Sequence, residues 1–193
     1  MKKIIITFFL FVTFFSFSSA QDFKFNLKKN GTFELDKEGT SFVVIPFEGK
    51  TAQELYRMVK FNILNIYKNP KLVLNEIEPV SLTIHALSDE MYSSYNIPRG
   101  IVTYYAYYNL NFHFKDGRIK VDSPTIDSDL LVEASNYPLP KSFPSFVSGL
   151  FDKNGSPKEK KKDTINKIES YFNTTIYSIL GYYNKSDNIK DNW

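Results

Sequence analysis

The sequence predicts an α+β protein in which two helices pack on one face of an antiparallel sheet, after a short N-terminal hairpin. Apolar and polar residues alternate along 102–115, which is typical of a long strand with one buried face. Two stretches, 51–68 and 157–183, repeat their apolar residues at the spacing of an amphipathic helix. Each helix must bury its apolar stripe, and the apolar face of the sheet can cover both.

The N-terminal segment has the pattern of a secretory signal peptide. Lys2 and Lys3 precede the uncharged apolar run 4–17, and Ser18-Ser19-Ala20 supplies small residues for a cleavage site. A membrane span needs about 20 apolar residues, which is more than this run offers. We therefore expect cleavage after Ala20 rather than a retained anchor, with no transmembrane span in the mature chain. The protein is then exported, either periplasmic or secreted.

Charge and cysteine content exclude some classes of function. The full chain has 24 Lys and Arg against 21 Asp and Glu; removal of Lys2 and Lys3 leaves 22 against 21, a net charge of +1. Nucleic-acid binding needs many side chains that neutralise phosphates, so we expect no nucleic-acid partner. The chain has no cysteine, so it has neither a disulfide nor a thiol for lipid attachment. The mature protein depends on its core alone.

After the signal peptide, 1–20, we expect one domain at 21–183, a length that suits a single core. Within it we expect a sheet core at about 41–127, a loop at 128–156 and a C-terminal helix at 157–183. The polar tail 184–193 has the composition of a frayed terminus.

The first predicted element is a hairpin at 23–35, where apolar and polar residues alternate on both sides of a loop, Lys29-Asn30-Gly31. Matching the apolar pairs across the turn sets Leu27 opposite Phe33 and puts Gly31 where a three-residue loop needs a left-handed residue.

A strand at 41–47 and the first helix follow the hairpin. The strand is β-branched and aromatic, and its Pro46 favours a sheet edge. Thr51 and Glu54 form a T-x-x-E capping box that begins the helix. Asn69-Pro70 is expected to stop it.

Two further strands are predicted at 72–77 and 81–87, whereas 88–100 has the composition of a loop. The stretch 102–115 is one long strand, because its even-numbered residues are all apolar or aromatic. Asp116-Gly117 is a strong signal for a two-residue hairpin turn. The pairing that this turn sets keeps the apolar residues on one face.

The C-terminal part is predicted to be a loop and then a helix. Pro138, Pro140 and Pro144 interrupt 128–156, and a connection of this length usually serves a function or moves as a flap. Ser156 is the expected N-cap of the helix, with proline at its first position and glutamate at its third. The expected buried stripe of this helix is Ile165, Ile168, Phe172, Ile176, Ile179 and Tyr183.

Three motifs resemble a bacterial family of exported proteins: the "SSAQ" that ends the signal segment, the "ELY" that opens the first helix, and "TYYAYYNLNFHFKDGRIKV" at 103–121. That family is catalogued as a domain of unknown function with a TBP-like fold. The resemblance covers roughly 40–127 and implies a curved antiparallel sheet backed by helices. It implies no activity and supplies no catalytic residues.

If both helices cover one face of the sheet, the other face is open. By alternation this open face carries seven residues: Thr83, His85, Tyr105, Tyr107, Asn109, Asn111 and His113. Tyrosine with asparagine and threonine gives large rigid contact areas and adaptable hydrogen bonds, which is typical of binding surfaces. The hypothesis is a protein or peptide partner. An equal alternative is that these tyrosines only shield the sheet or pack beneath the loop at 128–156.

The sequence favours neither a metal site nor a catalytic centre. Both histidines lie on the open face, but no third ligand follows at ligand spacing, so no metal or other cofactor is expected. There is no G-x-S-x-G motif and no cysteine nucleophile, and Asp127 and Asp129 are expected in a loop. We predict a non-catalytic binding module. The alternatives are a small envelope enzyme using His85 or His113 as acid/base, and self-association through the open face.

Overall fold

The computed structural model describes the following parts of the chain: 23–35, 39–96, 100–134 and 141–182. The expected signal peptide 1–20, the polar tail 184–193 and Tyr183 lie outside these residues.

The described elements run in the order β1 (Phe25–Leu27), β2 (Phe33–Leu35), β3 (Phe42–Pro46), α1 (Ala52–Ile66), α2 (Pro70–Val73), β4 (Leu74–Ile77), β5 (Ser81–Leu87), β6 (Tyr92–Asn96), β7 (Gly100–Lys115), β8 (Arg118–Asp122), β9 (Thr125–Ala134), β10 (Lys141–Ser142), α3 (Phe143–Ser148), the 3-10 turn η1 (Glu159–Lys161) and α4 (Lys162–Ile179).

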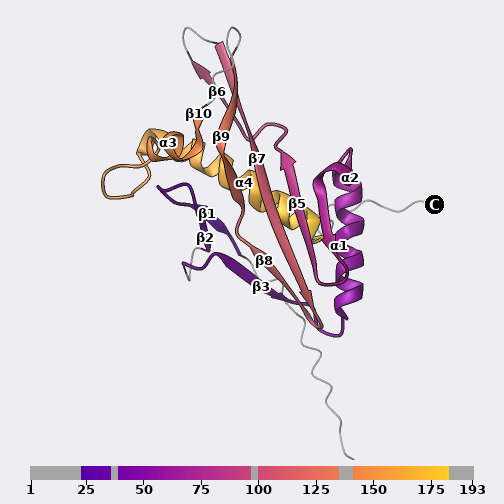
Figure 1. The fold of residues 1–193 in the computed structure, drawn as a ribbon. Coiled ribbons are helices and arrows are strands. Elements are labelled where there is room, and N and C mark those ends of the chain that lie inside the picture. The colour runs from indigo at the N-terminus through magenta and orange to yellow at the C-terminus, as the bar shows by residue number, and fades with distance from the viewer. Residues whose placement is uncertain (1–22, 36–38, 97–99, 135–140, 183–193) are drawn as a thin grey trace, which may run out of the picture.

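Strand β7 is the centre of a large antiparallel sheet (Figure 1). It pairs with β5 and β6 along one edge and with β8 and β9 along the other. Strand β4 extends the sheet beyond β5, and β3 extends it beyond β8. The α+β prediction is confirmed: the described chain has a large antiparallel sheet, a separate hairpin, two long helices and shorter helical segments.

The alternation along β7 divides the sheet into two faces as predicted. Ala106, Tyr108, Leu110 and Phe112 are buried on the side of the helices. The Asp116-Gly117 turn sets the predicted register, with Phe112 opposite Val121 and Phe114 opposite Ile119. Because side chains alternate strictly, the intervening residues of β7 point to the opposite face.

Helix α1 begins with the predicted capping box and packs on the apolar face. The Thr51 backbone N–H donates to Glu54 at 2.8 Å, and the Glu54 N–H donates to Thr51 Oγ1 at 3.3 Å. The next free amide, that of Ala52, donates to Asp116 Oδ1 at 2.8 Å, which ties the helix to the β7–β8 turn. The helix ends before Pro70, and Pro70 then begins the short helix α2.

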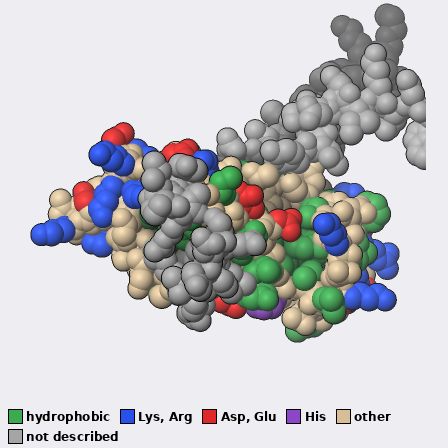
Figure 2. Space-filling model, turned by 90° about the horizontal axis from the view of Figure 1, so that it is seen from above, with side chains coloured by type: hydrophobic (Ala, Val, Ile, Leu, Met, Phe, Trp, Pro, Cys, Tyr) green, Lys and Arg blue, Asp and Glu red, His purple; other side chains and the backbone are tan. Residues whose placement is uncertain are grey.

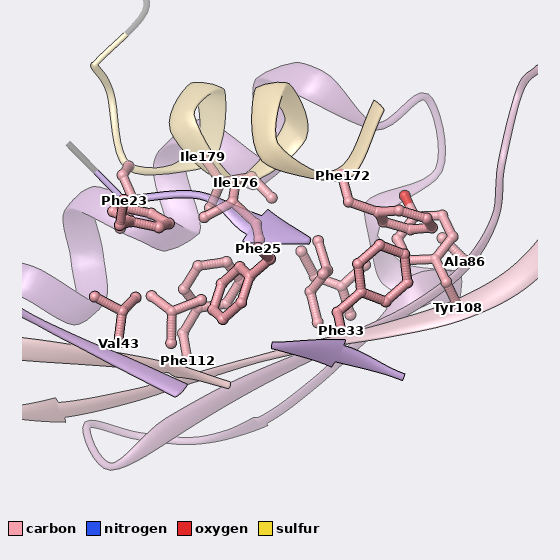
Figure 3. Packing of buried hydrophobic residues seen from close by; sticks show 14 of the residues in the cluster. Phe23, Phe25, Phe33, Val43, Ala86, Tyr108, Phe112, Phe172, Ile176 and Ile179 are labelled. Carbon is pink, nitrogen blue, oxygen red and sulfur yellow. The ribbon is translucent and has the colours of Figure 1, made fainter. Parts of the chain in front are cut away.

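The hairpin β1–β2 lies between α4 and the large sheet. Its register is the predicted one, Phe25 opposite Leu35 and Leu27 opposite Phe33, and Gly31 has the expected positive φ of 87°. Figure 3 shows Phe25 and Phe33 inside the space between α4 and the sheet. The Phe33 ring packs edge-on against Phe172 of α4, with 5.2 Å between ring centroids.

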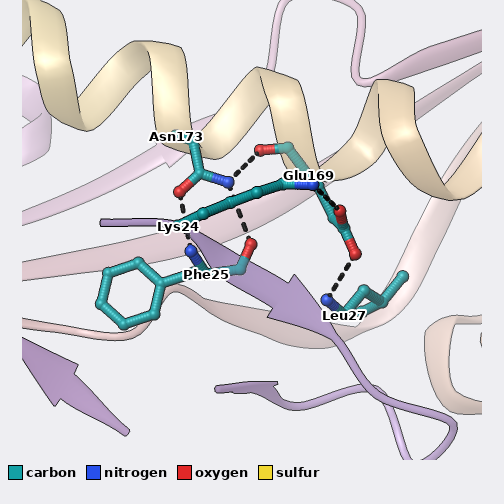
Figure 4. A network of polar contacts seen from close by, with 5 residues as sticks. All are labelled: Lys24, Phe25, Leu27, Glu169 and Asn173. Atoms are coloured by element: carbon teal, nitrogen blue, oxygen red, sulfur yellow. Dashed lines mark hydrogen bonds and ion pairs between the residues drawn. The ribbon is translucent and has the colours of Figure 1, made fainter. Parts of the chain in front are cut away.

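Side chains of α4 bind the edge of β1 that does not pair with β2. Asn173 accepts from the Phe25 N–H and donates to the Phe25 carbonyl, both at 2.9 Å (Figure 4). Buried Glu169 accepts from the Leu27 N–H at 2.9 Å and pairs with the Lys24 ammonium at 2.8 Å. These contacts satisfy backbone groups that would otherwise be buried without partners.

The spacing of these contacts follows from the geometry of the two elements. Tyr177 continues the series by accepting from the Phe23 N–H and donating to the Phe23 carbonyl. Positions four apart on a helix rise by about 6 Å, and positions two apart on a strand by about 6.8 Å. Side chains of α4 therefore bond the backbone of Phe23, Phe25 and Leu27, as a neighbouring strand would do.

Two segments predicted as loops are partly strands. Strand β6 lies within 88–100, where its serines gave no apolar alternation. The prediction of a loop at 128–156 is wrong in three places. Strand β9 continues to Ala134, and the segment also contains strand β10 and helix α3. Asp127 and Asp129 therefore lie on strand β9, which pairs with β7, and not in the predicted loop.

The start of the C-terminal helix also differs from the prediction. Helix α4 begins at Lys162 after η1, and no side chain caps it. Pro157 instead bridges to Phe151 in an isolated antiparallel pair, which holds that segment extended. The predicted stripe is confirmed from Ile165 to Ile179, where all five described members are buried.

We predict that Asn173→Ala lowers the free energy of unfolding by about 2 to 3 kcal/mol, because it leaves both backbone groups of Phe25 buried and unpaired. Urea denaturation followed by circular dichroism measures the change. Asn166→Ala, on the exposed side of the same helix, should change stability by less than about 0.5 kcal/mol. Equal effects of the two substitutions would contradict the role assigned to Asn173.

Candidate functional site

The seven predicted open-face residues lie on one face of the sheet, opposite α1 and α4. In the register, His85 is opposite Asn109 and Thr83 is opposite Asn111. Tyr107 is 43% exposed, whereas its neighbour Tyr108 is 1% exposed. Tyr108 is thus buried with other even-numbered residues of the strand, on the face that the alternation predicts to be apolar.

The packing role of Tyr108 is reinforced by other tyrosines on the helix side of the sheet. The hydroxyls of Tyr67 and Tyr108 are 2.9 Å apart, and Tyr171 packs edge-on against the Tyr108 ring. Burial raises the pKa of Tyr67 to about 12. These side chains stay neutral at physiological pH and belong to the core.

His85, Asn109 and Tyr107 form a continuous group in the middle of the open face. His85 Nδ1 is 2.9 Å from Asn109 Oδ1, and the His85 and Tyr107 rings are stacked with centroids 5.7 Å apart. Asn109 Nδ2 also reaches Asp127 Oδ1 at 3.5 Å. The stack fixes the orientation of an exposed aromatic ring, which lowers the entropy lost when a partner contacts it.

An irregularity in β9 lies directly beside Tyr107. Between Ala106 and Tyr108 the partner on β9 moves from Leu130 to Ile126, so β9 carries extra residues opposite Tyr107. Such bulges redirect side chains and are common next to functional sites. The sequence offered no signal for this feature, because it arises from the register of two strands distant in the chain.

His113 lies in a second polar group further along β7. His113 Nε2 is 3.0 Å from Asp122 Oδ2, and the Lys120 ammonium is 2.8 Å from Asp122 Oδ1. Burial raises the pKa of Asp122, but the hydrogen bonds from Lys120 and His113 outweigh that effect and leave the pKa lowered. Asp122 is thus the carboxylate that pairs with Lys120 and His113 in this group.

The register also places Ser81 opposite His113. Serine, histidine and aspartate are thereby neighbours, which the sequence alone did not indicate. No hydrogen bond joins Ser81 to His113 among the described residues. Throughout the described residues, no group of three or more His, Cys, Asp or Glu side chains has the arrangement of a metal site.

Exposed apolar residues extend the open face beyond the predicted seven. Leu87 lies opposite Tyr107, Ile77 opposite Ser81 and Val44 opposite Lys120, and all three are exposed. The alternation in 81–87 could have found Leu87. Val44 was hidden because β3 has apolar residues on both faces.

Figure 2 shows the molecule from above the view of Figure 1. On this side hydrophobic side chains gather together, with a histidine at their border and Lys and Arg side chains beyond them. Apolar and charged groups are therefore side by side on this part of the molecule.

A small cavity of about 210 Å³ opens at the β7–β8 hairpin end of the open face. Its lining combines one apolar side chain with four nitrogen-bearing ones: Val44, His113, Lys115, Arg118 and Lys120. We call this the basic pocket. It shares His113 with the open face, so the two are continuous.

Two solved bacterial structures share this fold. One is a TBP-like protein from Parabacteroides distasonis, with a TM-score of 0.52 and 10% identity over 76% of this chain and 92% of that one. The other is a DUF4468 family protein from Bacteroides ovatus, with a TM-score of 0.51 and 8% identity over 77% of this chain and 87% of that one. The TBP-like fold implied by the sequence resemblance is confirmed.

Other comparisons add nothing to this result: neither a protein-family model nor a curated protein matches the sequence. No helix among the described residues is long and apolar enough to cross a membrane.

We predict very different losses of stability for alanine substitution at the neighbouring tyrosines of β7. Tyr107→Ala should change the free energy of unfolding by less than about 0.5 kcal/mol, because the side chain is on the surface. Tyr108→Ala should lower it by about 3 to 5 kcal/mol, because it opens a cavity in the core. Urea denaturation of both variants measures the difference. A large loss for Tyr107→Ala would mean that the open face is covered.

Proposed function

We propose that this chain is an exported, non-catalytic binding module that uses its open face to hold a protein or peptide in the cell envelope or outside the cell. The observation that carries the proposal is the group of Tyr107, His85 and Asn109, an oriented and exposed aromatic ring among hydrogen-bonding side chains. Export is inferred from the N-terminal segment of the sequence.

The chemistry of the open face suits a polypeptide partner. Tyr107 and Leu87 offer apolar contact side by side. The Asn111 amide adds a donor and an acceptor for a peptide backbone, whereas the Asn109 amide already bonds His85 and Asp127. A rigid sheet presents these groups without a large ordering cost on binding. Specific interfaces combine such aromatic anchors with polar surroundings.

The alternative is a small envelope enzyme with His85 or His113 as acid/base. One observation favours it: Asp122 bonds His113, and Ser81 lies opposite His113, so the three groups of a hydrolytic triad are neighbours. The missing hydrogen bond between Ser81 and His113 favours the binding hypothesis. Equal rates of hydrolysis of a chromogenic acetyl ester by wild-type, His85→Gln and His113→Gln protein would reject the alternative.

We predict that a photo-crosslinking residue at position 107 captures a partner in the native envelope fraction, because this ring is exposed at the centre of the open face. The same residue at Lys161, which is exposed ahead of α4, is the matched control and should capture nothing. Mass spectrometry of the crosslinked product identifies the partner.

Capture at both positions, or at neither, would count against the open face as the binding surface. A product of twice the chain mass would instead identify self-association through this face. Sedimentation equilibrium of the uncrosslinked protein would then show a dimer, and Tyr107→Ala should weaken it.

A further inference from the structure

The basic pocket brings like charges together in a way that opposes folding. Lys115 and Arg118 are a directly opposed cross-strand pair next to the Asp116-Gly117 turn. Lys120 is the next residue of β8 on the same face, opposite His113. Like charges that face each other across two strands are destabilising, so this arrangement weakens the hairpin that carries it.

The acidic residues that flank the pocket in sequence are engaged elsewhere. Asp116 accepts from the Ala52 N–H at 2.8 Å and so belongs to the start of α1. Asp122 bonds Lys120 and His113. Among the described residues, neither Lys115 nor Arg118 has an ion-pair partner. Two cations that line the pocket are left without a counter-charge.

Lys120 is also held in place on its apolar side. Its ammonium lies 4.8 Å from the centroid of the Phe42 ring and 2.8 Å from Asp122 Oδ1. A cation fixed by a carboxylate and an aromatic ring has little freedom left to lose on binding. The pocket therefore has one positioned cation and two unpaired ones around a cavity of about 210 Å³.

We infer that the basic pocket is a binding site for an oxyanion, a carboxylate or phosphate group carried by the partner of the open face. A guanidinium binds either group with two parallel hydrogen bonds, and ammonium groups add charge from the sides. The identity of the carrier rests on the proposed function, because His113 joins the pocket to the open face. The anion site itself rests only on Lys115, Arg118 and Lys120.

The experiment titrates wild-type protein with inorganic phosphate and, separately, with acetate, each against sodium chloride at the same ionic strength. Backbone amide NMR signals between His113 and Lys120 should shift and saturate with the oxyanion but not with chloride. A stronger response to phosphate indicates a phosphate-bearing partner, and an equal or stronger response to acetate indicates a carboxylate.

The variant Lys115→Gln/Arg118→Gln should bind the oxyanion at least about fivefold more weakly, because it removes the unpaired cations. Without the anion it should melt about 1 to 3 °C higher, because the like-charge pair is gone. The control Lys160→Gln/Lys161→Gln makes the same charge change at exposed positions of η1. It should keep the wild-type affinity.

Equal weakening by the variant and the control would overturn the inference, since it would reduce the effect to net charge. Capture of a partner at Tyr107 with no specific response to phosphate or acetate would also overturn it, while leaving the proposed function intact. Saturable binding at the pocket without capture at Tyr107 would support the anion site and count against the proposed function.

Discussion

The alternation of side chains along β7 is the constraint on which the rest of the structure depends. Four other described strands pair with this one, and each inherits its division into a buried and an exposed face. A slip of one residue would move Tyr108, Leu110 and Phe112 into water and His113 into the core. The register is therefore fixed by the core, and the open face follows from it.

On the helix side of the sheet, the core is closed by contacts between helix α4 and strand β1. Hairpin β1–β2 has too few residues to be stable alone. Asn173 and Glu169 complete the hydrogen bonds of β1, so the hairpin can be buried without unpaired amides. Phe25 and Phe33 then fill the space beneath α4. The helices and the hairpin occupy one face of the sheet together, and the seven open-face residues lie on the other.

The sequence predicted those features that local patterns determine. The capping box at Thr51, the turn at Asp116-Gly117 and the faces of β7 were all visible as short motifs or periodic spacing. Strand β9 was missed because backbone pairing with β7 holds it despite its aspartates. The contact of Asn173 with Phe25 joins residues far apart in the chain, and no local pattern indicates it. Most of the basic pocket lies on the β7–β8 hairpin, whose register the turn does predict, and only Val44 of β3 comes from a distant segment.

The turn between β7 and β8 shows how one acidic residue links the start of a helix to the charges at the end of the sheet. Asp116 could neutralise Lys115 or Arg118, but its carboxylate accepts the Ala52 amide and so helps to begin α1. A carboxylate at a helix N-terminus is favoured by the helix dipole as well as by the hydrogen bond. That contact fastens α1 to the sheet and at the same time leaves the pair of cations without a counter-charge. The carboxylate nearest in sequence to Lys115 and Arg118 is thus used to anchor the helix, and the oxyanion that we propose for the pocket would supply the missing negative charge.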